Sequence, residues 1–527
     1  MVNSDKIEKV YITNRELPGT SSTQEGHLEV AIHGPRLPFG SVHCESLTPI
    51  FQTDSVYGIN SSEALATSGR SIAGAGTGAT SGANGMFKCN TGTTSYSFAT
   101  IQSRRRLRYR PGQGTVGRFS ALFSAPVASS IVVAGFGTSE SGFYFGYNGT
   151  SFGVLHVTGG VRELQTMTIT TASTATNDYV VTLPNGTTAN VTATNNSSTA
   201  RTAYEISRGT FPGWDAWSRG STVLFLSNSA GPVTGTFSLA QTGAGSPAAA
   251  TVAETTAGVA STDTWVAQSS WNGDKLDGTG YSGITLDPSK GNVFQIGMQY
   301  LGFGCVTMSV ETVTPDGNNP DFVVAHTFRF PNARTTPHVS NPSFPFTMAA
   351  YSAGSTTDVS VSVGSFGGFT EGQKRLTGPR MSYFNTSGVT SSTSAYTPIF
   401  TVRNDRVYGG KANQSVVNLL SVGGVAKSTT GITSFFVIRN ANLTAGNPNF
   451  TSYATTSCTY TDTAATACTF ATNDQVVWTG TVAGDGSFVF PFSDDVTLQP
   501  GESITIAVRS VTSTATCVGQ LNTREDQ

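Results

Sequence analysis

The stretch from Phe143 to His156, FYFGYNGTSFGVLH, constrains the possible folds of this chain most. Its Asn-Gly pair is a strong signal for a two-residue β-hairpin turn. With that pair at the tip, Phe145 faces Phe152 and Phe143 faces Val154, so these four apolar side chains share one face. A two-stranded ribbon of this kind must bury its apolar face against another sheet. The chain is therefore expected to consist of packed sheets.

Composition favours an all-β protein. Glycine makes up 59 of the 527 residues, charged residues 12% and aromatic residues 10%, and the long Ala, Leu, Glu and Lys stretches of helical proteins are missing. Charged residues usually make up about 25%, and the apolar content is high enough to form cores. Turn signals about 8–12 residues apart indicate β-sandwiches. We predict an all-β, multi-domain chain of β-sandwiches, jelly-roll-like, with a small β-rich insert.

Changes of texture along the sequence divide the chain into segments. Aromatic strand patterns stop where a Thr- and Ala-rich stretch begins and resume after it, which indicates an insertion into one sandwich. The arm at the start is polar and contains at most one short strand, His27 to Ile32. The predicted segments are an N-terminal arm (1–40), a discontinuous β-sandwich (41–162 together with 262–372), an inserted small β-rich module (163–261) and a C-terminal β-sandwich (373–527).

Several local elements are predicted inside these segments. The small-residue run Ser68 to Gly85 is expected to be a loop, Thr202 to Ser207 a short helical turn, and Pro184 to Gly186 a hairpin tip. Alternating apolar residues predict six strands in the C-terminal segment. These strands are TPIFTVRN, VVNLLSVGGVAK, TSFFVIRN, QVVWTGTV, GSFVFPF and ESITIAVRS.

Charge and targeting signals give little support for nucleic-acid or membrane partners. The net charge of −2 creates no field that attracts nucleic acid or an anionic membrane. No run of about 18 apolar residues predicts a membrane span. The start of the chain lacks the apolar region of a secretory signal, so no classical signal peptide is expected.

The sequence assigns no metal, cofactor or catalytic residue. None of the six cysteines forms a CxxC pair, and Cys458 with Cys468 are either a disulfide across one hairpin or buried free thiols. The run from Asp316 to Asp321 is rich in oxygen ligands, but it lacks the spacing of a calcium-binding EF-hand and is expected to be a turn. Asp274 and Asp277 are likewise expected to be turn residues.

The histidines point the same way. They show no HxH or HExxH spacing, no GxSxG motif has plausible partners, and no P-loop is present. A structural place is therefore expected for each of the six histidines: His27, His33, His43, His156, His326 and His338.

The densest charge in the sequence is a run of five arginines: Arg104, Arg105, Arg106, Arg108 and Arg110. One interpretation is contact with nucleic acid or with an acidic partner chain, but the chain as a whole is slightly acidic. Alternation along a strand would put Arg106, Arg108 and Arg110 on one face, with Leu107 and Tyr109 on the other. We therefore predict a solvated or subunit-facing strand surface. The candidate interface residues are Arg104, Arg106, Arg108 and Arg110.

Two tryptophans flank an aspartate in the predicted insert. Trp214 and Trp217, on either side of Asp215, form a candidate glycan-binding group, because aromatic rings beside polar groups can stack on a sugar. The alternative is that at least one of the two rings anchors the small core of the insert.

Four stretches of the sequence together resemble a known protein family. They are RYRPGQGTVGRFSALF, FYFGYNGTSFGVLH, TWVAQSSWNGDKLDGTGYSGITLDPSKGNVFQIGMQYLGFG and SNPSFPF. The resemblance is to structural proteins of tailed phages and of large DNA viruses of algae and marine protists, described as capsid-associated, spike, fibre or tail components. It covers about 100–160 and 262–372 and, more loosely, the C-terminal segment. The insert resembles small modules that recur in phage structural proteins, and no catalytic residues of the family carry over.

The resemblance implies a non-enzymatic protein located in the virion. Such a protein assembles through its β-sandwiches with itself, as a homotrimer, and with other virion proteins. A receptor- or glycan-binding adhesin, with host surface glycans as its partner, is the alternative function. A polysaccharide-degrading enzyme is a third class, which would need carboxylates or a His, Tyr and Arg cluster in one groove.

Overall fold

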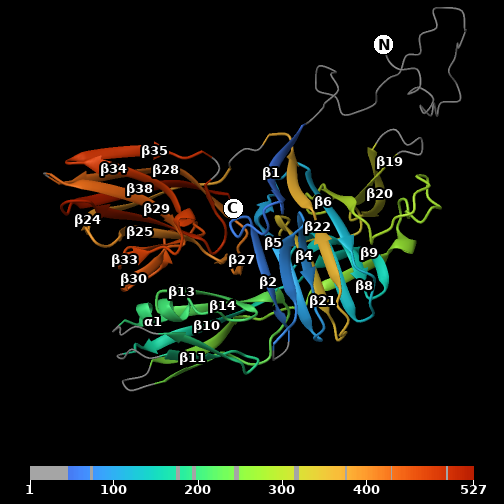
Figure 1. Cartoon of the computed structure of the whole chain (residues 1–527), viewed down its shortest axis with the longest axis horizontal. Coiled ribbons are helices and arrows are strands. Elements are labelled where there is room, and N and C mark those ends of the chain that lie inside the picture. The colour runs from blue at the N-terminus through green and yellow to red at the C-terminus, as the bar shows by residue number, and fades with distance from the viewer. Residues whose placement is uncertain are drawn as a thin grey trace, which may run out of the picture. The chain divides into compact units, whose positions relative to one another are not determined.

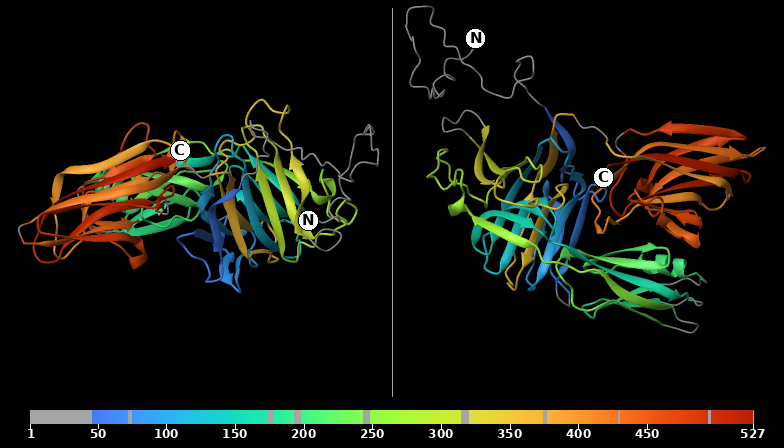
Figure 2. Two further views of the ribbon diagram at one scale, coloured as in Figure 1. Left: turned by 90° about the horizontal axis from the view of Figure 1, so that it is seen from above. Right: turned by 180° about the vertical axis from the view of Figure 1, so that it is seen from behind.

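The protein is all-β, with antiparallel sheets throughout the part of the chain that the computed structural model describes. The described residues are 46–71, 75–173, 178–192, 198–242, 248–313, 320–373, 377–428, 430–493 and 496–526. The predicted arm, including His27 to Ile32, lies outside these residues. Figures 1 and 2 show three groups of sheets, coloured blue to yellow, green, and orange to red. We call them the large sandwich, the middle module and the C-terminal sandwich.

The large sandwich consists of two sheets, and each sheet combines strands from before and after the middle module. The order of the nine-stranded sheet is β20 (Pro320–Phe328), β19 (Val306–Val313), β18 (Asn292–Met298), β6 (Thr115–Phe123), β22 (Ser360–Val363), β4 (Met86–Asn90) and β3 (Ala79–Ala83), with β23 (Ser365–Glu371) on β6 and β1 (Leu47–Asp54) on β23. The order of the seven-stranded sheet is β17 (Thr262–Ala267), β9 (Ser151–Thr158), β8 (Gly142–Asn148), β7 (Ser130–Gly137), β21 (Phe344–Ser352), β5 (Ser97–Leu107) and β2 (Ala64–Arg70). A 3-10 turn, η2 (Gln268–Ser270), follows β17.

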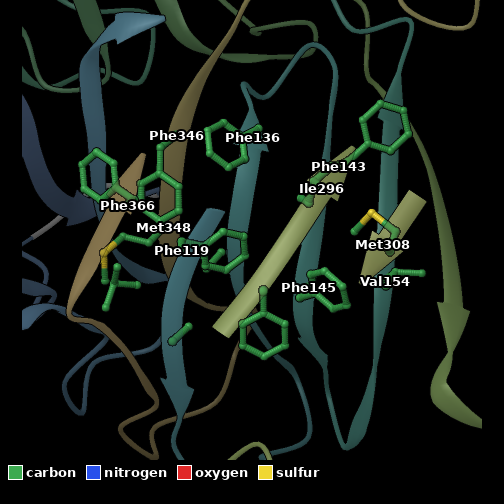
Figure 3. Close-up of a cluster of buried hydrophobic side chains, with 14 of the residues drawn as sticks. Phe119, Phe136, Phe143, Phe145, Val154, Ile296, Met308, Phe346, Met348 and Phe366 are labelled. Atoms are coloured by element: carbon green, nitrogen blue, oxygen red, sulfur yellow. The ribbon is translucent and has the colours of Figure 1, made fainter. Parts of the chain in front are cut away.

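Phenylalanines from the two sheets form the core between them. Phe119 of β6 lies 5.3 Å from Phe346 of β21 and 5.4 Å from Phe294 of β18, measured between ring centroids. Figure 3 shows Phe119, Phe136 and Phe346 in this cluster. Gly117 of β6 makes room for it, because a Cβ there would come within 2.1 Å of the Phe136 ring. Aromatic pairs of this kind add roughly 0.5–1.5 kcal/mol each beyond the area that they bury.

The predicted hairpin is present, but its register is two residues away from the prediction. Phe145 pairs with Val154 and Phe143 with His156, so the two loop residues are Gly149 and Thr150 rather than the Asn-Gly pair. Asn148 stays in β8 because that strand also pairs with β7 as far as Asn148. Gly149 takes a φ of 58° at the first loop position, as in a type II′ turn. A shift of two residues preserves the faces of a strand, and the four predicted apolar side chains are all buried.

The segment predicted as a small-residue loop contains strands instead. Residues 68–85 include the end of β2 and all of β3. β3 pairs with β4 over five residues, from Ala79 opposite Asn90 to Ala83 opposite Met86. Strand pairing through backbone hydrogen bonds does not require large side chains, and the Gly- and Ala-rich sequence therefore hides this strand.

The middle module packs two small sheets with the one α-helix of the described residues. Its four-stranded sheet is β13 (Trp214–Arg219), β14 (Thr222–Ala230), β10 (Arg162–Thr171) and β16 (Ala249–Thr256), and its three-stranded sheet is β12 (Thr188–Thr192), β11 (Asp178–Thr182) and β15 (Ser238–Gln241). The helix α1 (Thr199–Ile206) covers the predicted helical turn, and Ser198 caps it by accepting a hydrogen bond from the N–H of Arg201. The predicted hairpin tip at 184–186 joins β11 to β12.

The C-terminal sandwich contains all six strands predicted for it. Its larger sheet is β31 (Thr451–Ser452), β32 (Thr459–Asp462), β25 (Thr397–Asn404), β37 (Ser503–Ser510), β29 (Ile432–Arg439) and β34 (Val476–Ala483). The facing sheet is β24 (Arg380–Thr390), β38 (Thr516–Asp526), β28 (Val416–Lys427) and β35 (Gly486–Pro491), with β36 (Thr497–Leu498) also on β28. Two ribbons and a 3-10 turn complete it: β26 (Val407–Tyr408) with β27 (Lys411–Ala412), β30 (Asn442–Gly446) with β33 (Ala465–Thr469), and η3 (Asn473–Gln475). The sequence analysis missed β24 and β38, which are rich in polar residues.

The middle module leaves and re-enters the large sandwich at one point. The last residue of β9, Thr158, pairs with the first residue of β17, Thr262. The two strand ends are therefore cross-strand neighbours whether or not the module lies between them.

This pairing predicts that the module can be removed. Replacing residues 159–261 with Asn-Gly should join β9 and β17 in a two-residue hairpin, which the antiparallel register favours. The shortened chain is expected to keep its strand signal in circular dichroism and a cooperative unfolding transition in urea, with the intact chain as the control. Aggregation or a gradual loss of signal would contradict this expectation.

Candidate functional site

The sequence-predicted residues lie mainly where one part of the chain contacts another. The described residues contain no group of three or more His, Cys, Asp or Glu side chains that could hold a metal ion. None of the helices described is long and apolar enough to cross a membrane. The polar contacts between parts of the chain are therefore the most distinctive chemical feature.

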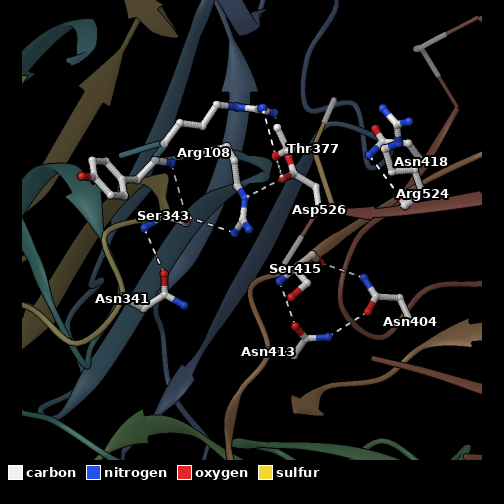
Figure 4. Close-up of polar contacts among 12 residues, drawn as sticks. Arg108, Asn341, Ser343, Thr377, Asn404, Asn413, Ser415, Asn418, Arg524 and Asp526 are labelled. Atoms are coloured by element: carbon white, nitrogen blue, oxygen red, sulfur yellow. Dashed lines mark hydrogen bonds and ion pairs between the residues drawn. The ribbon is translucent and has the colours of Figure 1, made fainter. Parts of the chain in front are cut away.

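The arginine run contacts carboxylates of the same chain. Arg108 and Arg110 both pair with Asp526 near the C-terminus, with N–O distances of 3.5 and 3.0 Å. Arg108 also donates to the Ser343 hydroxyl at 3.2 Å (Figure 4). Arg104 lies 3.7 Å from a carboxylate oxygen of Glu502. The predicted alternation is incomplete, because β5 ends at Leu107 and the last arginines follow the strand rather than extend it.

Arg106 and Arg105 differ from the others in the run. Arg105 is exposed to solvent. Arg106 is half-buried, and its Nε and Nη1 atoms have no hydrogen-bond partner in the protein. Burial lowers the pKa of Arg106 to about 10, and the charge of Arg162 lowers it further. The run thus contains one exposed and one unpaired guanidinium beside three paired ones.

The tryptophan group lies on β13, against the core of the module and against the C-terminal sandwich. Trp214 packs edge-on against Phe237, 4.9 Å between centroids, inside the core of the middle module. Trp217 is 4% exposed and belongs to a small cluster with Val407 and Ala412 of the C-terminal sandwich packed against it. Asp215 forms a 3.0 Å ion pair with Arg406. Stacking on a sugar requires an open ring face, and Trp217 has none in this arrangement.

A buried aspartate, Asp405, is the centre of the neighbouring contact. Its side chain is 0% exposed and pairs with Arg219 of β13 at 2.8 Å and with Arg403 of β25 at 3.4 Å. Arg403 donates to the Ser218 carbonyl at 2.6 Å and lies over the Phe450 ring, 4.0 Å from its centroid. The contact therefore combines charge, hydrogen bonds and cation–π stacking.

The position of Asp405 is fixed by a hydrogen-bond network at the end of β25. Asn404, the residue before it, donates to the carbonyls of Ser415 and Leu498 at 2.8 and 3.0 Å. Asn413 donates to Asn404 at 2.8 Å and accepts from the N–H of Ser415 (Figure 4). Burial lowers the pKa of Arg219, but the hydrogen bond and charge of Asp405 outweigh it, so its pKa is raised overall.

Helix α1 adds a second contact with the C-terminal sandwich. Arg201 pairs with Glu205 one turn later at 2.9 Å and donates to the carbonyls of Leu443 and Thr444 at 2.9 and 3.1 Å. Tyr204 accepts a hydrogen bond from the Leu443 N–H at 3.0 Å. Sequence reasoning missed this contact and Asp405, because single charged residues in separate segments give no sign that they meet.

The cysteines and turn aspartates have structural places. The five described cysteines are free thiols, and Cys458 and Cys468 are buried. Cys458 precedes β32 and Cys468 lies in β33, which belong to different sheets, so the disulfide alternative is wrong. Asp274 accepts hydrogen bonds from the N–H groups of Leu276 and Ser282, as expected of a turn residue. Asp277 likewise accepts from Thr279, and positions 316–319 of the oxygen-rich loop lie outside the described residues.

Three buried histidines gather at one end of the large sandwich: His156, His326 and His338. His156 stacks on Phe143, 4.7 Å between centroids, and His338 stacks on Phe330 at 4.0 Å. Burial lowers the pKa of His156 to about 4 and that of His338 to about 3, and the charge of Arg334 lowers both further. His27, His33 and His43 lie outside the described residues.

Loss of the Asp405 carboxylate should destabilise the protein strongly. Asp405→Ala leaves Arg219 and Arg403 without their shared partner, and breaking a buried pair in this way costs roughly 3–5 kcal/mol. Asp215→Ala is the matched control, because it removes a partly exposed Arg partner on the other side of the same contact and should cost about 1 kcal/mol or less. Urea unfolding of both variants measures the difference; equal effects would contradict it.

The buried histidines should make the protein sensitive to mild acid. They are neutral in the folded protein, and their pKa values lie below the ordinary 6.5, so unfolding takes up protons once the pH falls below about 6.5. The free energy of unfolding is therefore full above pH 6.5 and falls from there toward pH 4. The variant His156→Phe with His338→Phe should flatten this fall between about pH 6.5 and 5, where most carboxylates do not titrate. An unchanged pH profile of the melting temperature would contradict the assignment.

Comparison with known proteins adds no family to this picture: no protein-family model matches the chain, and no curated protein matches its sequence.

Proposed function

We propose that this chain is a non-enzymatic structural protein of a virion, such as a minor capsid, spike, fibre or tail-associated component. It acts through assembly of its β-sandwiches with copies of itself and with other virion proteins. The resemblance of its aromatic strand stretches to structural proteins of tailed phages and large DNA viruses motivates the virion location and the homotrimer.

The observation that carries the proposal is an uncharged outer face on the C-terminal sandwich. Phe384, Gln520, Gly423 and Val489 lie side by side across β24, β38, β28 and β35. Phe384 is 62% exposed and Val489 68% exposed. Exposed apolar side chains gathered on one face are typical of protein-contact surfaces.

The rows on either side of this one are also uncharged. One row contains Val425, which is 45% exposed, between Ser487 and Val518. The other row contains Ser421, between Pro491 and Asn522. Depletion of charge at the centre of a surface favours protein contacts over solvent. This favours assembly over the adhesin alternative, whose candidate ring Trp217 is buried.

Mass spectrometry of purified particles of the encoding virus tests the location. We expect peptides of this chain at a constant ratio to the major capsid protein through successive density gradients. Light scattering of the purified protein tests self-assembly, since a trimer has a mass of about 165 kDa, three times 54.9 kDa. Absence from gradient-purified particles would overturn the proposed function, whatever the mass of the free protein.

A further inference from the structure

Strand β35 is the least protected edge of the C-terminal sandwich. Natural sheets guard their edges with bulges, charges, proline or short strands. Among the described strands, the other edges of the two large sheets carry such features. β31 has two residues, β24 begins at Arg380 and contains a bulge after Asn385, and β34 contains a bulge at Val477. β35 pairs with β28 without interruption, has no charged residue, and has proline only at its last position.

The backbone groups that β35 presents to the outside can be identified. The N–H of Phe492 donates to the Leu420 carbonyl of β28 at 2.9 Å. Hydrogen bonding alternates along an antiparallel strand, so Phe488 and Phe490 bond to β28 as Phe492 does. The N–H and C=O of Ser487 and Val489 therefore point away from β28, toward the open edge.

We propose that β35 pairs with β35 of a second copy of this chain around a two-fold axis at Val489. In this register Val489 lies opposite its own copy and exchanges both backbone hydrogen bonds with it. Ser487 lies opposite the partner's Pro491 and donates to its carbonyl, so the missing N–H of proline leaves one bond unmade on each side. The two five-stranded sheets then continue into one another.

Side chains on both faces suit this register. Antiparallel neighbours share a face, so the outer face joins two exposed valines. On the inner face Phe488 lies opposite the partner's Phe490, beside Trp478, which already lies 5.0 and 5.3 Å from the rings of Phe488 and Phe490 in its own chain. A strand without charge meets its own copy without like-charge repulsion, and a two-fold contact is the commonest solution for identical chains.

This inference rests on the proposed assembly function, because it names a contact through which copies meet. It joins chains in pairs, and it is independent of a threefold contact elsewhere. Loss of the β35 pairing should therefore halve the mass of the assembly, from about 110 kDa, twice 54.9 kDa, if pairs are the only contact.

Charge substitutions at Val489 test the two-fold register. Val489→Lys and Val489→Glu each place like charges directly opposite one another and should each halve the mass measured by light scattering at micromolar concentration. Mixing the two variants places Lys opposite Glu and should restore the full mass. The matched controls are Val511→Lys, Val511→Glu and their mixture, because Val511 is 64% exposed and lies outside β35; these should keep the wild-type mass throughout.

A third variant guards against misfolding. Ser487→Pro removes an outward N–H without adding charge or breaking a bond to β28, and it should also halve the mass, with an unchanged circular dichroism spectrum for each variant. A monomeric wild type, an undiminished mass in the Val489 variants, or a mixture that stays at half mass would overturn the β35 pairing. None of these results bears on the particle mass spectrometry, which tests the proposed function separately.

Discussion

Face-to-face packing of phenylalanine rings is the interaction on which the large sandwich depends. Phe119 contacts rings from three other strands, including Phe294 and Phe346, which come from after the middle module. Strands distant in sequence can bury these rings only if they share the same two sheets. The core thus requires chain closure across the whole module before its contacts form, which favours slow folding.

Charge is scarce in this protein, and much of it is used inside the chain. Asp405 and Asp526 each bind two arginines, and Glu502 contacts Arg104 and Arg439. Carboxylates from the C-terminal sandwich thereby hold residues of the module and of the large sandwich. The outer sheet face is left with apolar and neutral polar groups, and this division of charge separates internal cohesion from external contact.

Much of the fold could be predicted from sequence because strands with alternating apolar residues state their own burial. TPIFTVRN and SIVVAGFG coincide with β25 and β7 to the residue. Prediction failed where pairing depends on the backbone or on a neighbour: β3 consists of small residues, and the hairpin register is set by β7 rather than by its own turn. The candidate site was the least predictable, since the residues that meet around Asp405 come from segments almost 200 positions apart.

The direct pairing of Thr158 with Thr262 has an evolutionary consequence. A domain joined at one hairpin can be exchanged by recombination without disturbing the host sheet, so this position is suited to acquiring new modules. The buried Asp405 limits that freedom, because a newcomer has to bring an arginine to the place of Arg219 or leave a carboxylate short of a partner. Exchange at this site should therefore leave a trace: modules that replace one another here would share a cation at that position even where the rest of their sequences has diverged.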